Sequence, residues 1–149
     1  GEGPIYATVL CDFQKPTLDL RIDATIGKFS VKRLNDFLIP NERKEVTDGT
    51  VEDGKLTMTV KNGVARTTVL PHYHHLSMKI LTEQAGKKSG LLEGIKSFVA
   101  NTFVLHSPNM APYAISGNSV YPRKKSEEFL QFLWIAIRKA VGKVIGGFD

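Results

Sequence analysis

The sequence lacks an uninterrupted apolar run of the roughly 18 residues or more that mark a membrane-spanning helix. The best candidate lies near the C-terminal end, and Arg138 and Lys139 interrupt it. The first residue is Gly rather than Met, so we expect a piece of a longer protein whose signal or anchor lies outside it. Of the 149 residues, 42% are hydrophobic and 23% are charged. This balance favours a single folded domain over residues 1–149 rather than a disordered chain.

The sequence also lacks the motifs of the common enzyme classes. It contains no glycine-rich phosphate loop, no HExxH helix and no GxSxG elbow. The single Cys11 cannot form an internal disulfide. In a strand, His72 and His74 share a face, but no spacing selects a third metal ligand, so we expect these to be surface or strand-end histidines. We therefore predict a protein that is not an enzyme, with no catalytic residue, no metal and no cofactor.

A basic stripe interleaved with aromatic residues is missing as well. The net charge is +5, but lysines and arginines are scattered, and Arg123-Lys124-Lys125 is the one tight basic run. A nucleic-acid site needs such a stripe with bases stacking on aromatic side chains. We expect no nucleic-acid partner.

The sequence does contain many stretches with patterns typical of β-strands. Seven stretches are rich in β-branched, aromatic or alternating apolar residues. They cover residues 5–13, 18–26, 55–60, 64–70, 73–81, 102–106 and 119–121. The dipeptide Asn62-Gly63 is the strongest signal for a tight hairpin turn. Together these features predict an antiparallel meander in the middle of the chain.

Glycine and proline predict where these strands are interrupted. We expect Pro40 to stop a short helical turn that begins at Val31, and residues 41–48 to form a loop. The Asp48-Gly49 pair and Gly54 predict further turns, and Pro71 is expected to end a strand.

The alternation of side chains gives the predicted sheet one polar and one apolar face. Asp19 and Asp23 share a solvated face, where Arg21 between them lessens their repulsion. The apolar face is the candidate ligand-binding surface. Its members are Leu56, Met58, Val60, Leu76, Met78 and Ile80.

Two helices are predicted, both amphipathic. The shorter covers residues 91–100, after a loop over residues 84–90, and the longer runs from Ser126, as its cap, to Gly146-Gly147. The candidate site residues on one face of the longer helix are Phe129, Leu130, Leu133, Ile137, Val141 and Val144, with Ala140 among them and Trp134 at the border. Phe132 and Ile135 are expected on the opposite side. Two interpretations stay open: the helix covers the sheet, or it lies in a membrane interface with cations flanking its apolar face.

The ordered set of segments resembles the C-terminal region of bacterial AsmA-like proteins, in the group of repeating β-groove, or bridge-like, lipid-transfer proteins. The matching stretches are 34–40, 46–49, 73–76 with 80–81, 94–101, 120–121 and 129–134, followed by Gly142. The histidines at positions 72–75 and the Met-Ala-Pro-Tyr stretch at 110–113 depart from that pattern.

The resemblance implies an α+β fold of mainly antiparallel β structure: a curved meander sheet with two amphipathic helices, the longer one C-terminal. It also implies a non-enzymatic module of the periplasm and cell envelope, within a full-length protein anchored in the inner membrane. Such a module contributes to phospholipid transport or outer-membrane homeostasis, with phospholipid, the membrane surface or an outer-membrane protein as partner. For the apolar residues, a closed core under the helices is the alternative. For the function, the alternative is an envelope scaffold or protein–protein interaction domain that pairs through an open sheet edge and binds no lipid.

Overall fold

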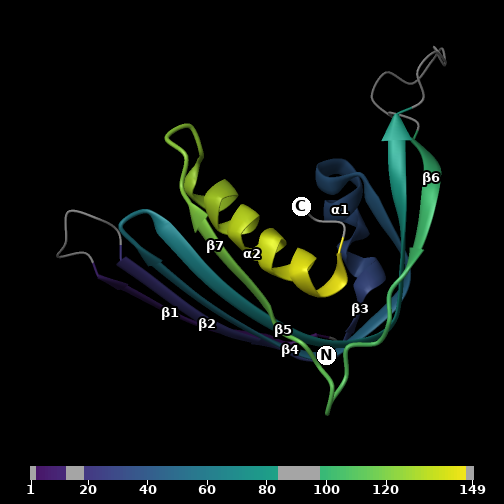
Figure 1. Cartoon of the computed structure of the whole chain (residues 1–149), viewed down its shortest axis with the longest axis horizontal. Helices are drawn as coiled ribbons and strands as arrows, with labels where there is room; N and C mark the ends of the chain where they lie inside the picture. The colour runs from purple at the N-terminus through teal and green to yellow at the C-terminus, as the bar shows by residue number, and fades with distance from the viewer. Residues whose placement is uncertain (1–2, 13–18, 84–97, 147–149) are drawn as a thin grey trace. The chain divides into compact units, whose positions relative to one another are not determined.

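The computed structural model describes residues 3–12, 19–83 and 98–146, and for 83 and 98–105 it describes the backbone alone. In chain order the elements are β1 (Ile5–Asp12), β2 (Asp19–Ile26), β3 (Phe29–Ser30), a 3₁₀ helix η1 (Val31–Leu34), α1 (Asn35–Glu42), β4 (Lys44–Lys61), β5 (Val64–Glu83), β6 (Phe98–Leu105), β7 (Gly117–Pro122) and α2 (Phe129–Ile145). The strands form one open sheet in the order β1-β2-β4-β5-β6, with β3 beside β4 and β7 beside β5 (Figure 1). This confirms the predicted fold class: α+β, mainly antiparallel, with the longer helix at the C-terminal end.

The chain divides into two compact units, and each has its own buried residues and its own helix. Unit 1 contains Gly1–Phe29, Val51–Tyr73 and Asn109–Asp149, and unit 2 contains Ser30–Thr50 and His74–Pro108. The long strands β4 and β5 contribute residues to both units. Helix α2 belongs to unit 1, and α1 belongs to unit 2.

The hairpin between β4 and β5 turns at Asn62-Gly63, as predicted. Both residues have positive φ, 50° and 71°, which a two-residue turn between twisted antiparallel strands requires. The strands themselves are longer than predicted, at 18 and 20 residues. The predicted loop over 41–48 and the turn around Gly54 were therefore wrong, because β4 continues from Lys44 through both.

Pro71 lies inside β5 and does not end it, against the prediction. β5 pairs with β7 over Val64–Val69 and with β6 over Ser77–Glu83. Pro71 falls between these two stretches, where neither strand needs the N–H that proline lacks. The side-chain amide of Asn109 donates instead to the Pro71 carbonyl, at 2.6 Å.

In unit 2, α1 and η1 pack on β4 and β5. The buried apolar residues of this core are Val31, Leu38, Val46, Leu76 and Met78, with Leu81 beside them. The side chain of Asn35 pairs with the backbone of Val46 as a strand would, accepting from its N–H at 2.8 Å and donating to its carbonyl at 3.0 Å. These bonds fix the start of α1 against β4.

In unit 2 the prediction that Pro40 ends a helical turn was wrong. Pro40 lies inside α1, which ends two residues later, where Arg43 adopts φ 52°. So short a helix loses one hydrogen bond to the proline and still packs through Leu38. The predicted groove residue Ile80 is 38% exposed, and Leu81, which follows it at a register shift of β5 against β6, is buried.

The predicted shorter helix is also corrected in part. Residues 98–100 belong to strand β6, which pairs antiparallel with β5. The predicted loop at 84–90 and residues 91–97 lie outside the described part of the chain. The second helix described here is α1, at 35–42.

The C-terminal helix forms over most of its predicted range. α2 ends at Gly146, as predicted, but its N-cap is Glu128 and not Ser126. Its buried line is Phe132, Ala136 and Ala140, and Leu130 is 76% exposed. The prediction that Phe132 faces away from the packed side was wrong. The buried side is a line of Phe132 and two alanines, which the helical spacing of the large apolar residues does not single out. Among the described residues no helix is long and apolar enough to cross a membrane.

Candidate apolar site beside the C-terminal helix

One face of the unit 1 sheet is built entirely from apolar residues over three neighbouring strands. The printed register joins these residues into cross-strand rows, and alternation along each strand points them to one side. The rows are Cys11–Leu20–Val60, Val9–Ile22–Met58, Ala7–Ala24–Leu56 and Ile5–Ile26–Gly54. No polar side chain interrupts this surface, which we call the apolar face.

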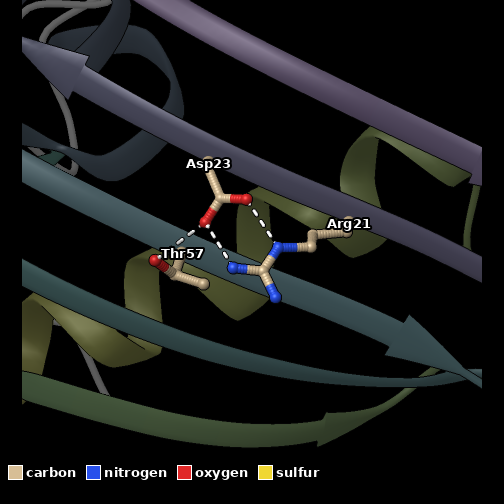
Figure 2. A network of polar contacts seen from close by, with 3 residues as sticks. All are labelled: Arg21, Asp23 and Thr57. Carbon is tan, nitrogen blue, oxygen red and sulfur yellow. Dashed lines mark hydrogen bonds and ion pairs between the residues drawn. The ribbon is translucent and has the colours of Figure 1, made fainter.

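On β2 and β4 the opposite face is polar. Arg21 donates to Asp23 through Nε at 2.6 Å and through Nη2 at 3.1 Å, and Thr57 donates to Asp23 at 3.3 Å. Figure 2 shows this network on the near side of the strands, with α2 behind them. The hydrogen bond from Arg21 lowers the pKa of the exposed Asp23 carboxyl. The predicted solvated face, with Arg21 offsetting carboxylate repulsion, is confirmed for Asp23.

Helix α2 covers only part of the apolar face. It lies along one side of the unit 1 strands (Figure 1), and Phe132 and Ala136 pack into one buried cluster with Met58 and Val60. Along one row, exposure then rises from Met58 at 0%, through the partly buried Ile22, to Val9 at 57%. The side of the face formed by β1 therefore stays open to solvent beside the helix.

Small residues let α2 approach β7 very closely. A Cβ added at Gly117 in β7 would lie 1.9 Å from the carbonyl oxygen of Ala140 in α2, a distance that no side chain tolerates. Ser119, two residues along β7, donates its hydroxyl to the Ala136 carbonyl at 2.7 Å. The position of α2 on the sheet is set by this contact as much as by apolar packing.

A polar network ties the start of α2 to the end of β7. The Tyr121 hydroxyl donates to Oε1 of the buried Glu127, and the Lys124 N–H donates to its Oε2 at 3.1 Å. Arg123 donates to the Glu127 backbone carbonyl at 3.2 and 2.8 Å and lies 6.0 Å from the centre of the Phe132 ring. The hydrogen bond between Tyr121 and Glu127 lowers the pKa of Glu127 and raises the pKa of Tyr121.

The predicted groove residues divide between the two units. Leu56, Met58 and Val60 belong to the apolar face of unit 1, where Met58 and Val60 are covered and Leu56 is partly exposed. Leu76, Met78 and Ile80 belong to unit 2, where the first two are buried.

The predicted residues of the C-terminal helix differ in their surroundings. Three of them pack beside the buried cluster: Phe129, Leu133 and Ile137. Ile135, which was expected on the opposite side of the helix, packs beside the same cluster. Trp134, Val141 and Val144 are partly buried, and Leu130 is exposed.

The sequence prediction missed the open part of the apolar face, which is formed by Ile5, Ala7 and Val9 of β1. Strand β1 is apolar on both sides: Tyr6 and Leu10, which point the other way, are 71% and 60% exposed. A strand without alternation does not indicate which side is buried. Its neighbour held the usable signal, because the polar residues Asp19, Arg21 and Asp23 of β2 mark the opposite face of the pair.

The histidine cluster forms ordinary surface contacts. Nδ1 of His72 lies 2.8 Å from Oδ1 of Asp53, and the rings of His74 and His75 meet edge to face at 4.8 Å. Within residues 3–12, 19–83 and 98–146, no group of three or more metal-ligating side chains gathers.

Comparison with known proteins gave no match to any family model, curated protein or solved structure. The resemblance to AsmA-like proteins therefore stays a prediction.

Proposed function

We propose that this chain is a non-enzymatic module of the cell envelope, of the periplasm in particular, that binds phospholipid acyl chains on the apolar face beside α2. One observation carries the proposal. The row Met58–Ile22–Val9 runs from full burial under the helix to open solvent without a polar side chain. An uncovered apolar surface of this kind favours an apolar ligand or partner.

The dimensions of the face suit an acyl chain. From Ile5 to Cys11 a strand advances roughly 20 Å at about 3.4 Å per residue. The hydrocarbon of one bilayer leaflet is about 15 Å thick, half of a core of about 30 Å. A chain lying along β1 and β2 against the side of α2 would contact apolar side chains over its whole length. Each buried CH₂ group contributes about 0.8 kcal/mol.

The experiment uses two neighbouring residues as a matched pair. Val9 and Leu10 are similarly exposed, at 57% and 60%, but point to opposite sides of β1. Lipids are extracted from purified native protein, Val9→Asp and Leu10→Asp, and quantified by mass spectrometry. We expect Val9→Asp to retain at least about tenfold less phospholipid than the native chain, because it places a charge within the apolar face.

Leu10→Asp is expected to retain phospholipid at the native level. Equal loss from both variants would assign the effect to general damage to β1, and absence of phospholipid from the native protein would contradict the proposal. Circular dichroism of all three proteins checks that the fold is kept.

A second function, an envelope scaffold that binds another protein, is favoured by a separate observation. β1 is an edge strand of the sheet and contains neither lysine nor proline, the residues that usually protect such edges. Pairing with a strand of another molecule would cover Tyr6 and Leu10 as well. This function would be favoured if the native protein carries no lipid and its self-association rises with concentration. We would then expect Leu10→Asp to weaken that association.

A further inference from the structure

The segment between β6 and β7 presents apolar side chains to solvent. From Ser107 to Asn118 the sequence contains no charged residue. Met110, Tyr113 and Ile115 are 37%, 88% and 55% exposed. We call residues 110–115 the apolar loop. These three exposed apolar side chains lie within six residues of one another, with no charged residue between them.

The apolar loop is held in one conformation from within. Asn109 is 5% exposed, and its Nδ2 donates to the carbonyls of Pro71 at 2.6 Å and Ile115 at 3.0 Å. Its Oδ1 accepts the N–H of Ile115 at 2.8 Å. The backbones of Asn109 and Tyr73 exchange two further hydrogen bonds, at 3.0 and 3.2 Å. The exposed side chains are thus presented by an ordered scaffold, which lowers the entropy cost of binding.

The loop lies at the end of the apolar face formed by Ile5. The cross-strand row Ile5–Ile26–Gly54 continues to β5, because Gly54 lies beside Leu70 and Pro71. Pro71 is the residue whose carbonyl Asn109 binds. The loop therefore lies across β5 from the Ile5 end of the apolar face, and all of these residues belong to unit 1.

Two pairs of charged residues near this row bind one another, and Lys55 follows Gly54 on β4. Nζ of Lys28 lies 2.9 Å from Oε2 of Glu52, and Nδ1 of His72 lies 2.8 Å from Oδ1 of Asp53. The basic run 123–125 follows Pro122, which pairs with Val64, the first residue of β5 and seven residues before Pro71. The loop itself contains no charged residue, and Lys139 and Lys143 belong to the turns of α2 that meet Gly117 beside it.

We propose that the apolar loop inserts into the headgroup region of a phospholipid bilayer through its uncharged side chains and brings the Ile5 end of the apolar face next to the lipid. Tyrosine suits this depth, because its ring is apolar and its hydroxyl is polar. The membrane attachment stands on the loop itself. Its role, as the route by which an acyl chain reaches the apolar face, rests on the proposed function.

The test measures flotation of the purified protein with phosphatidylcholine vesicles, at low and high salt. The variant is Tyr113→Ser with Ile115→Ser. The matched control is Val120→Ser, which removes a 65% exposed apolar side chain from β7, away from the loop. We expect the double variant to bind vesicles at least about tenfold more weakly, and the control and added salt to leave binding unchanged.

Depth is measured separately with Tyr113→Trp in a chain that also carries Trp134→Phe. We expect a blue shift of the emission on vesicle binding and quenching by lipids brominated near the headgroup. Native binding that the double variant leaves intact would overturn the proposal. So would binding confined to anionic vesicles and abolished by salt, or no binding at all.

These outcomes are distinct from those of the proposed function. A protein that retains phospholipid but fails to bind vesicles refutes the loop and keeps the apolar face. A protein that binds vesicles through the loop but carries no lipid refutes lipid binding on the apolar face and keeps the loop as a membrane attachment.

Discussion

At the residue scale, Glu127 shows how one buried carboxylate positions a helix. Its two oxygens accept from Tyr121 and Lys124, and its backbone carbonyl accepts from Arg123. A buried carboxylate is costly unless such bonds satisfy it. The bonds join the end of β7 to the first turn of α2, just before the helix begins to cover the apolar face.

The pKa of Glu127, lowered by its bond with Tyr121, predicts how stability depends on pH. A carboxyl whose pKa is lower in the folded state stabilises the fold above its unfolded pKa of about 4.3, and that contribution is lost as pH falls through the folded pKa. We expect Glu127→Gln to lower the thermal midpoint at neutral pH and to flatten its fall below about pH 4. Thermal melts across this range, followed by circular dichroism, measure it.

Glu128→Gln is the control, because it removes the same charge from the neighbouring exposed side chain. Equal effects of the two substitutions would contradict a special role for Glu127. At alkaline pH the raised pKa of Tyr121 gives stability the opposite pH dependence. The stabilisation from the Tyr121 hydroxyl is complete below about pH 10 and is lost as pH rises through its folded pKa.

At the element scale, α2 has one packed side, and a pair of substitutions identifies it. Phe132 is 1% exposed and Leu130 is 76% exposed, although both belong to the same apolar helix. We expect Phe132→Ala to lower the free energy of unfolding by about 3–5 kcal/mol, the usual cost of removing a buried aromatic ring. Leu130→Ala is expected to change it by less than about 0.5 kcal/mol. Urea denaturation measures both, and the reverse ranking would place Leu130 on the packed side, as its spacing alone predicts.

The sequence predicted which elements form better than where they end or which side they bury. The β4–β5 hairpin was predictable, because Asn62-Gly63 and the alternation beside it are local signals. Contacts between residues far apart in the sequence were not predictable, because no local pattern links Asn109 to Pro71 or Gly117 to Ala140. Pro71 does not end β5, because it falls between the stretches that pair with β7 and with β6.

At the scale of the whole molecule, the fold class and the polar face of β2 were predictable from residue patterns alone. The candidate site was predictable only in part. Leu56, Met58 and Val60 belong to it, but the open residues are on β1, whose two apolar sides gave no signal. The lipid function began as a resemblance, and the geometry now supports it through a single feature, the apolar face that α2 covers incompletely.

The most direct test of that feature is photo-crosslinking with a phosphatidylcholine whose acyl chain contains a diazirine, followed by mass spectrometry of the labelled peptides. We expect labels on Val9 and Ile22 of the apolar face and on Leu133, which flanks it from α2. We expect none on Leu10 or Arg21, their neighbours, which point to the opposite side of the sheet. Equal labelling of the two sides of β1 and β2, or no labelling of either, would contradict the account.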